Sequence, residues 1–287
     1  MNRLKPVFSL AGGVLLVSTA GLLIRISGGP PMKVAFYRVF FAFLIYTLVS
    51  GLFKLRIPYS LSFREIFLVV LAGVFLGLHF GFWVSAFGYT TVAGAVIPLS
   101  SQPIIVGVLG YLFYREKPER KILLPLFFIF TGLFVMFLMD MKIEISIGLG
   151  DILAFTGTVM VAFYFIVARL WVPRIGVLLF NMWTYGVATL VLLIGVLWGR
   201  FNLLPLRGVE LLCYFLLAFG CSFLGYSLIN NSLKHFRTVN VSLALVGEPA
   251  LSILWAFLFL SEALTVAQFL GFVLCVFGLF LHFRQIR

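Results

Sequence analysis

Charged residues are scarce in this chain. Only 10% of its 287 residues are Asp, Glu, Lys or Arg, whereas 63% are hydrophobic and 34 are Phe. Soluble domains are about 45–50% apolar and about 25% charged, so the excess apolar surface here must face lipid rather than water. The composition therefore excludes a water-soluble enzyme or binding domain and predicts an integral membrane protein.

Cysteine is also rare. The three cysteines, Cys213, Cys221 and Cys275, all lie within apolar runs, and the sequence contains no Cys-x-x-Cys or Cys/His grouping that would bind a metal. The net charge of +12 comes from basic residues that punctuate apolar runs instead of forming one patch. We therefore expect no metal, no cofactor and no nucleic-acid partner, and the lipid bilayer is the expected environment.

Long polar stretches are missing too. A helix needs about 20 apolar residues to cross the hydrocarbon of a membrane. The chain offers ten such runs, and little is left over for a domain outside the bilayer. The predicted fold is all-α and integral to the membrane, with ten transmembrane helices near residues 7–24, 34–53, 66–87, 92–113, 122–139, 151–171, 177–198, 211–233, 239–260 and 266–283.

The basic residues indicate how these helices are oriented. If both termini are cytoplasmic, fifteen Lys and Arg residues fall in cytoplasmic segments. Five fall in outside segments, namely Arg25, Lys33, Lys142, Arg200 and Arg207. Basic residues are enriched on the cytoplasmic side of membrane proteins. The sequence therefore predicts a multi-pass protein of the cell (inner) membrane with both termini cytoplasmic.

The two halves of the chain align with each other. A shift of 146 residues places Gln102 on Glu248 without a gap, and each is followed by Pro. Each half holds five predicted spans, an odd number, so the second half must enter the membrane in the opposite orientation. We predict two inverted five-helix repeats, residues 1–140 and 147–287. Inverted repeats are typical of carriers that work by alternating access.

A set of residues recurs in the two halves in the same order. The first half contains Arg38, Pro103, Glu116 and Gly132, and the second half contains Gly150-Asp151, Glu248-Pro249, Glu262 and Gly278. In this pattern the chain resembles the EamA-like family of the drug/metabolite transporter superfamily over essentially its whole length. The resemblance implies an inner-membrane carrier for amino acids or other small metabolites, often an exporter, that holds its substrate centrally between the halves.

Polar groups at membrane depth are the candidate site residues, because burying them is costly unless something binds or pairs them. Glu248 lies roughly 14 Å into its span at about 1.5 Å per residue. It is a candidate for proton coupling, and a structural carboxyl beside Pro249 is an equal alternative. His79 is similarly deep and shares a helix face with Trp83. We expect both to bind substrate, and His79 is a second candidate for proton coupling; a hydrogen-bonded core histidine is the alternative.

The other candidates for substrate binding each have a structural alternative. Arg38 either binds a substrate carboxylate or pairs with Glu248, or else extends to the headgroups. Gln102 lines a cavity beside Pro103 or bonds to another helix. Asn230 is expected near the cytoplasmic interface. The remaining candidates are aromatic, and either form cavity walls or simply pack: Trp183, Tyr164 and Tyr226. Because Trp183 falls about where the first half has Arg38, the predicted site is asymmetric.

Two other classes of protein share features of this sequence. Gly148-Leu149-Gly150-Asp151 matches the Gly-x-Gly-Asp motif of intramembrane aspartyl proteases, but the only other Asp is Asp140, and an Asp at a helix start normally caps the helix. A lipid-flipping or partner subunit would have the same composition. We expect a carrier, not an enzyme, with a small-molecule substrate, protons as a candidate coupling ion, and a monomeric or homodimeric state.

Overall fold

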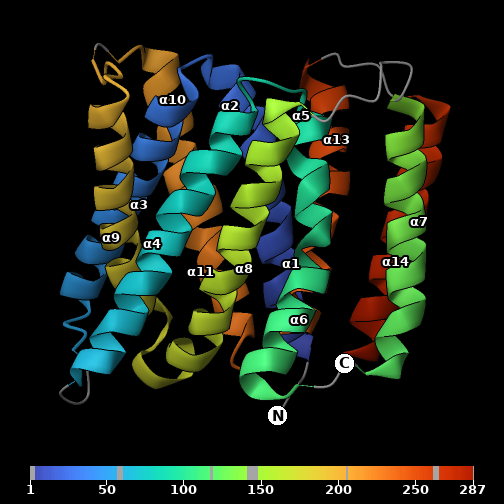
Figure 1. Cartoon of the computed structure of the whole chain (residues 1–287), viewed down its shortest axis with the longest axis horizontal. Helices are drawn as coiled ribbons and strands as arrows, with labels where there is room; N and C mark the ends of the chain where they lie inside the picture. Colours follow the sequence, from blue (N-terminus) through green and yellow to red (C-terminus); the bar gives the residue numbers. More distant parts are fainter. Residues whose placement is uncertain are drawn as a thin grey trace.

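The protein is described by a computed structural model over residues 4–56, 61–116, 119–140, 148–204, 206–260 and 265–286. These residues form helices and short connections, and no strand occurs among them. The helices stand side by side in one bundle (Figure 1). The part of the chain that the structure describes is therefore all-α, as the composition predicts.

The first half contains seven α-helices and two short 3₁₀ segments. The α-helices are α1 (Leu4–Ser18), α2 (Ala20–Ser27), α3 (Pro31–Leu52), α4 (Phe63–Ala86), α5 (Val92–Val96), α6 (Gln102–Tyr114) and α7 (Leu123–Asp140). The 3₁₀ segments are η1 (Ile97–Ser101) and η2 (Arg120–Ile122). The helices α1 and α2 together form one span, and α5, η1 and α6 together form another.

The second half also contains seven α-helices. Its α-helices are α8 (Leu149–Ile175), α9 (Val177–Trp198), α10 (Gly208–Leu216), α11 (Tyr226–Ser232), α12 (Thr238–Leu245), α13 (Gly247–Leu260) and α14 (Val266–Gln285). A π-helix, η3 (Leu217–Gly225), joins α10 to α11. The element α8 starts 145 residues after α1, close to the shift at which the two halves of the sequence align.

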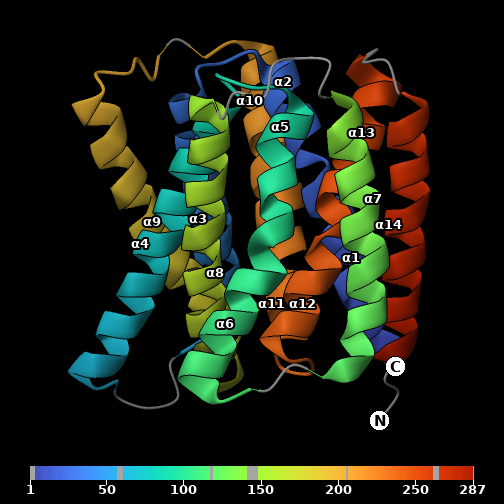
Figure 2. The same cartoon turned by 45° about the vertical axis from the view of Figure 1, so that its right-hand side comes forward.

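Nine helical segments of the described chain are long and apolar enough to cross a membrane. They identify a multi-pass membrane protein. The apolar helix α7, which is 18 residues long, is not among the nine, but it lies against α14 at one edge of the bundle (Figure 2). The count of ten includes α7 and stays a prediction.

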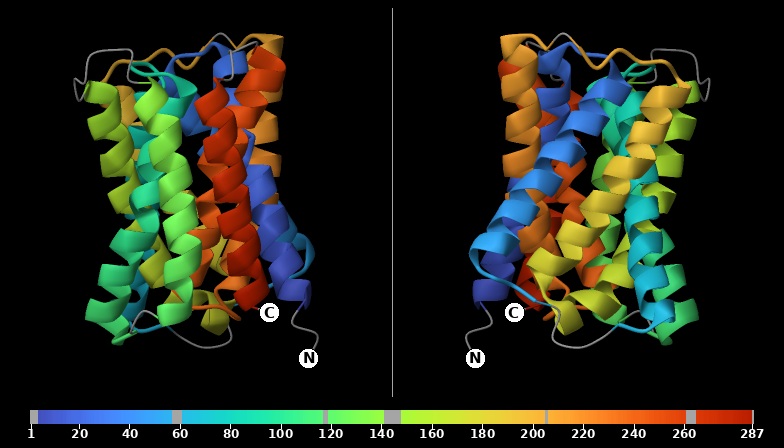
Figure 3. Two further views of the ribbon diagram at one scale, coloured as in Figure 1. Left: turned by 90° about the vertical axis from the view of Figure 1, so that its right-hand side faces the viewer. Right: turned by 90° about the vertical axis from the view of Figure 1, so that its left-hand side faces the viewer.

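The two halves enter the bundle from opposite ends. The helix α1 begins and α14 ends at the same end, which we call the terminal face (Figure 3). The helix α8 begins at the other end, the far face (Figure 1). This is the inverted arrangement that an odd number of spans in each half predicts.

Proline and glycine explain why spans are interrupted in the middle of the bundle. In the first half, Pro98 and Pro103 lie on either side of the junction between η1 and α6, where they remove backbone donors. In the second half, α12 gives way to α13 around Gly247 and Pro249. Non-helical backbone at membrane depth is tolerated where it is buried in protein or lines a cavity. The interruptions therefore point to the centre of the bundle as the site.

Glycines allow close contact at the edges of the bundle. A Cβ added at Gly132 of α7 would lie 2.5 Å from the carbonyl oxygen of Gly271 in α14. A Cβ at Gly77 of α4 would lie 2.9 Å from Val191 Cβ in α9. Both glycines bring two helix backbones together, as small residues do in membrane interfaces. These two interfaces are tightly packed and apolar.

The arrangement of the helices yields a topology prediction. Arg120, on the terminal face, and Asn202, in the α9–α10 connection at the far face, are both exposed. In a cysteine-free background, we expect a single cysteine at Arg120 to react with a membrane-impermeant thiol reagent only from the cytoplasm, and one at Asn202 only from outside. Labelling of both positions from the same side contradicts the orientation of the repeats.

Candidate functional site

A small cavity lies at the centre of the bundle, where the interrupted spans meet. Its volume is about 20 Å³, room for about one water molecule. Six residues singled out in the sequence line it, and they come from five different spans, because His79 and Trp83 share α4: Arg38, His79, Trp83, Gln102, Tyr226 and Glu248. Phe80 and Phe165 complete an aromatic wall. Residues separated by up to 210 positions in the sequence thus share one site.

Arg38 is the buried cation of this cavity, at 1% exposure. Its Nε donates a hydrogen bond to Ser222 Oγ at 3.0 Å, and its guanidinium carbon lies 4.4 Å from the centre of the Phe80 ring. Its Nη1 is buried and has no hydrogen-bond partner among the described residues. The alternative that Arg38 extends to the headgroups is therefore wrong, because Ser222 and Phe80 hold it at membrane depth.

Glu248 is the acidic group of the same cavity. It is the second residue of α13, and its exposure is intermediate while its immediate neighbours are buried. The structure shows no hydrogen bond or ion pair to its carboxylate from the residues that it describes. Glu248 therefore borders the cavity with its carboxyl group unpaired among the described residues, and Arg38 lines the same cavity.

Gln102 is the counterpart of Glu248 in the first repeat. It is the first residue of α6 and is 4% exposed, and its Nε2 is buried without a partner in the described part of the chain. Gln102 and Glu248 thus each stand at the start of a half-helix that begins inside the bundle. The N-terminus of a helix carries a partial positive charge, and carriers with interrupted helices use such ends to hold anionic substrate groups.

His79 is held by two hydrogen bonds. Its Nδ1 lies 2.9 Å from the carbonyl oxygen of Gly157, which can only accept, so Nδ1 carries the proton. Its Nε2 lies 3.5 Å from the hydroxyl of Tyr226 and accepts from it. This arrangement fits a neutral imidazole that links α4 to α8 and α11. The Trp83 ring stacks on His79 with centroids 5.9 Å apart, and Trp83 Nε1 donates to Ala95 O at 3.0 Å.

Tyr164 and Asn230 do not line the cavity but lie in a second buried cluster. Asn230 Nδ2 donates to Tyr164 OH at 2.6 Å and to Asn181 Oδ1 at 2.7 Å. Asn181 Nδ2 in turn donates to Tyr46 OH at 2.7 Å. Asn230 lies two residues before the end of α11, and its side chain is fully buried within this neutral network.

Asn181 is the central residue of this network, and the sequence reasoning missed it. The sequence did offer a sign of it, because Asn181 is a polar amide residue within an otherwise apolar run. Trp183, which the sequence favoured, is 49% exposed and is not one of the residues that line the cavity. The reason is helical geometry, because two residues turn the helix by about 200° and point Trp183 away from Asn181.

The network yields a stability prediction with an internal control. Asn230→Ala leaves the partners of a buried amide unsatisfied, which costs about 1–3 kcal/mol of the free energy of unfolding. Asn231, the next residue, is only partly buried. We therefore expect Asn230→Ala to lower the midpoint of thermal unfolding in detergent clearly, and Asn231→Ala to lower it little. Equal midpoints for the two variants contradict a stabilising role for the network.

The aspartate of the protease-like motif Gly148-Leu149-Gly150-Asp151 caps the start of a helix. Its Oδ2 accepts a hydrogen bond from the backbone N–H of Gly148 at 3.0 Å, at the start of α8. This is a capping contact that ties the side chain to the helix end. Asp151 is not among the residues that line the central cavity.

Comparison with known proteins identifies the family. The EamA-like transporter family matches residues 4–138 and again residues 148–284. The chain belongs to the EamA-like transporter family. It is therefore a membrane transporter of the drug/metabolite superfamily with a small-molecule substrate. The two matches cover nearly the whole chain, and the resemblance in the sequence motifs is confirmed.

A solved structure supports the fold. A crystal structure, described only as that of a protein, matches 98% of this chain and 96% of its own chain with a TM-score of 0.79 and 16% sequence identity. At this identity the likeness concerns the fold alone. No curated protein matches the chain.

Proposed function

We propose that this EamA-like protein is a secondary transporter that exports amino acids or related small metabolites across the cytoplasmic membrane by alternating access. Both termini are cytoplasmic in this proposal, and the repeats, residues 1–140 and 147–287, each supply five of ten spans. The observation that carries the proposal is the central cavity. The first repeat contributes Arg38, whose Nη1 has no hydrogen-bond partner among the described residues, and the second repeat contributes Glu248.

The chemistry of the cavity favours a zwitterion. A substrate carboxylate satisfies Arg38 Nη1 and Gln102 Nε2, both of which are buried without partners among the described residues. A substrate ammonium pairs with Glu248. The rings of Phe80, Trp83 and Phe165 supply apolar contact to the substrate side chain. A lipid-flipping subunit would have to hold a headgroup at a site open to the bilayer, whereas Arg38 and Gln102 are 1% and 4% exposed.

Transport by the purified protein tests this function. Proteoliposomes are loaded with a panel of labelled amino acids and metabolites, and efflux and exchange are measured with and without a pH gradient. We expect saturable flux of at least one zwitterionic compound, and none from liposomes without protein. An absence of flux across the whole panel contradicts the carrier and supports the partner-subunit alternative.

A further inference from the structure

A polar seam joins the two repeats along their length. It runs between α3 of the first repeat and the span of the second repeat that consists of α10, η3 and α11. Both α3 and α10 start at the far face (Figure 1). Three contacts hold this seam together: Lys33 with Glu210 at 2.9 Å, Arg38 with the hydroxyl of Ser222 at 3.0 Å, and Tyr46 with the carbonyl oxygen of the same Ser222 at 3.0 Å. Polar contacts can be exchanged for water, whereas the glycine-packed interfaces at the edges of the bundle cannot.

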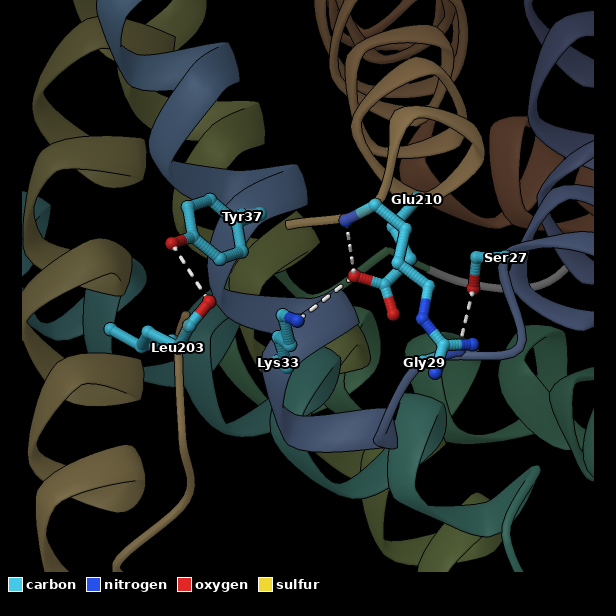
Figure 4. A network of polar contacts seen from close by, with 7 residues as sticks. Ser27, Gly29, Lys33, Tyr37, Leu203 and Glu210 are labelled. Atoms are coloured by element: carbon cyan, nitrogen blue, oxygen red, sulfur yellow. Dashed lines mark hydrogen bonds and ion pairs between the residues drawn. The ribbon is translucent and has the colours of Figure 1, made fainter. Parts of the chain in front are cut away.

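The contact nearest the far face is a buried ion pair (Figure 4). The side chains of Lys33 and Glu210 are only 6% and 8% exposed. Glu210 Oε2 also accepts the backbone N–H of Arg207 at 3.2 Å. One turn deeper, the rings of Tyr37 and Tyr214 stack with centroids 5.5 Å apart. Lys33 precedes Arg38 by five residues, so the ion pair lies about 7.5 Å from the cavity level along α3.

A buried ion pair can hold two helices together and still separate at a low cost in free energy. Removing two charges from water costs about as much as their attraction returns, so a buried ion pair adds little net stability. When the two helices separate, water reaches both charges and recovers that cost. Removing one partner alone is different, because it leaves the other charge buried and favours the hydrated, separated state.

The helix that carries Glu210 continues into an irregular segment. Below α10 the span continues as the π-helix η3, and π-helical segments commonly mark functional sites in helices. One face of α10 is turned to lipid, with Val209, Leu212 and Phe215 about half-exposed. The corresponding span of the first repeat, α4, is a single unbroken helix. Only the second copy of this span, among the described helices, therefore has a π-helical joint at the level of the cavity.

We propose that α10 is the gate of the central cavity on the far face, hinged at η3 and latched by the Lys33–Glu210 ion pair. The proposal rests on the carrier function above, because a gate requires a transport site. It does not depend on the identity of the substrate, since opening is measured by access to the cavity alone. Failure of the gate and failure of the carrier function are therefore distinguishable.

Thiol accessibility tests the gate. Leu99 lines the cavity, so Leu99→Cys in a background without Cys213, Cys221 and Cys275 reports access to it. The rate of reaction with a membrane-impermeant reagent is measured from each face. We expect Glu210→Gln and Lys33→Met each to raise the rate from the far face about tenfold or more by shifting the population to the open state. The double variant should react no faster than the faster single variant.

Glu65→Gln is the matched control. Glu65 also lies in the first turn of its helix, accepts the backbone N–H of Ser62 at 2.8 Å, and lies 3.7 Å from Arg174 of the other repeat. It is at the terminal face and more exposed, so its removal should leave far-face labelling unchanged. Gel filtration checks the fold of every variant, and Lys33→Gln replaces a variant that does not fold. Unchanged far-face rates in the folded variants, or equal increases from both faces, overturn the proposal.

Discussion

Glu248→Gln should abolish the acceleration of transport by a pH gradient while leaving exchange of labelled for unlabelled substrate. Glu248 borders the cavity with no partner among the described residues, so it is free to gain and lose a proton as the cavity opens to alternate sides. Gln keeps the shape of the side chain and its hydrogen-bonding capacity but cannot ionise. It also reproduces the amide that the first repeat already carries at Gln102. We expect gradient-driven flux to fall to the rate seen without a gradient.

The measurement is flux into proteoliposomes at matched protein levels, with and without an imposed pH gradient. Glu119→Gln is the control, because Glu119 lies on the terminal face in exposed ion pairs with Lys121 and Arg237. We expect this control to retain full gradient dependence. Gradient-driven flux that survives in Glu248→Gln places the coupling proton elsewhere, and His79 is then the next candidate. A wild type without gradient dependence is a uniporter, and Glu248 then has no coupling role.

Arg38→Ala should weaken substrate binding by about 10- to 100-fold, the worth of a hydrogen bond to a charged group. Arg38 Nη1 is the buried donor that the cavity leaves for a substrate carboxylate. Arg38→Lys should not restore affinity, because Lys cannot donate to Ser222 and to a substrate in the same fixed geometry. The half-saturating substrate concentration for exchange measures the effect.

Two controls accompany this test: a second arginine, Arg25, and a substrate analogue without the carboxylate. Arg25 also lies over a phenylalanine ring, that of Phe87 at 5.9 Å, but it donates to the carbonyl oxygen of Thr90 away from the cavity. Arg25→Ala should change the half-saturating concentration little. A substrate analogue in which an amide replaces the carboxylate should bind wild type and Arg38→Ala about equally. If Arg38→Ala weakens the amide as much as the acid, Arg38 shapes the cavity without binding a carboxylate.

The sequence predicted the site unevenly. Arg38, His79, Trp83, Gln102, Tyr226 and Glu248 were all singled out because they are polar or aromatic at membrane depth, and all six line one cavity. The rule failed where side-chain direction mattered. Asn230 is polar and lies near the end of its span, yet it points into the bundle and is fully buried. The outward direction of Trp183 could not be read either, because these helices are apolar on every face and carry no polar stripe to orient them.

The ion pair between Lys33 and Glu210 illustrates the same limit. Both residues stand near the start of a span, where charged residues are common and usually solvated. Nothing in their positions, 177 residues apart, indicates that they meet. Their contact exists because α3 and α10 lie side by side at the seam between the repeats, and the covering side chains remove them from water.

The sequence by itself determined the membrane environment, the helical spans of the described chain and the duplication with inversion. These follow from local properties, because hydropathy decides which segments enter lipid and the parity of spans decides the orientation of each half. Only the tertiary structure decided which polar groups face each other, where Arg38 is held and how the seam between the repeats is built. The physical reason is that helices surrounded by lipid are not oriented by hydrophobicity, so close packing and the pairing of buried polar groups fix their rotation.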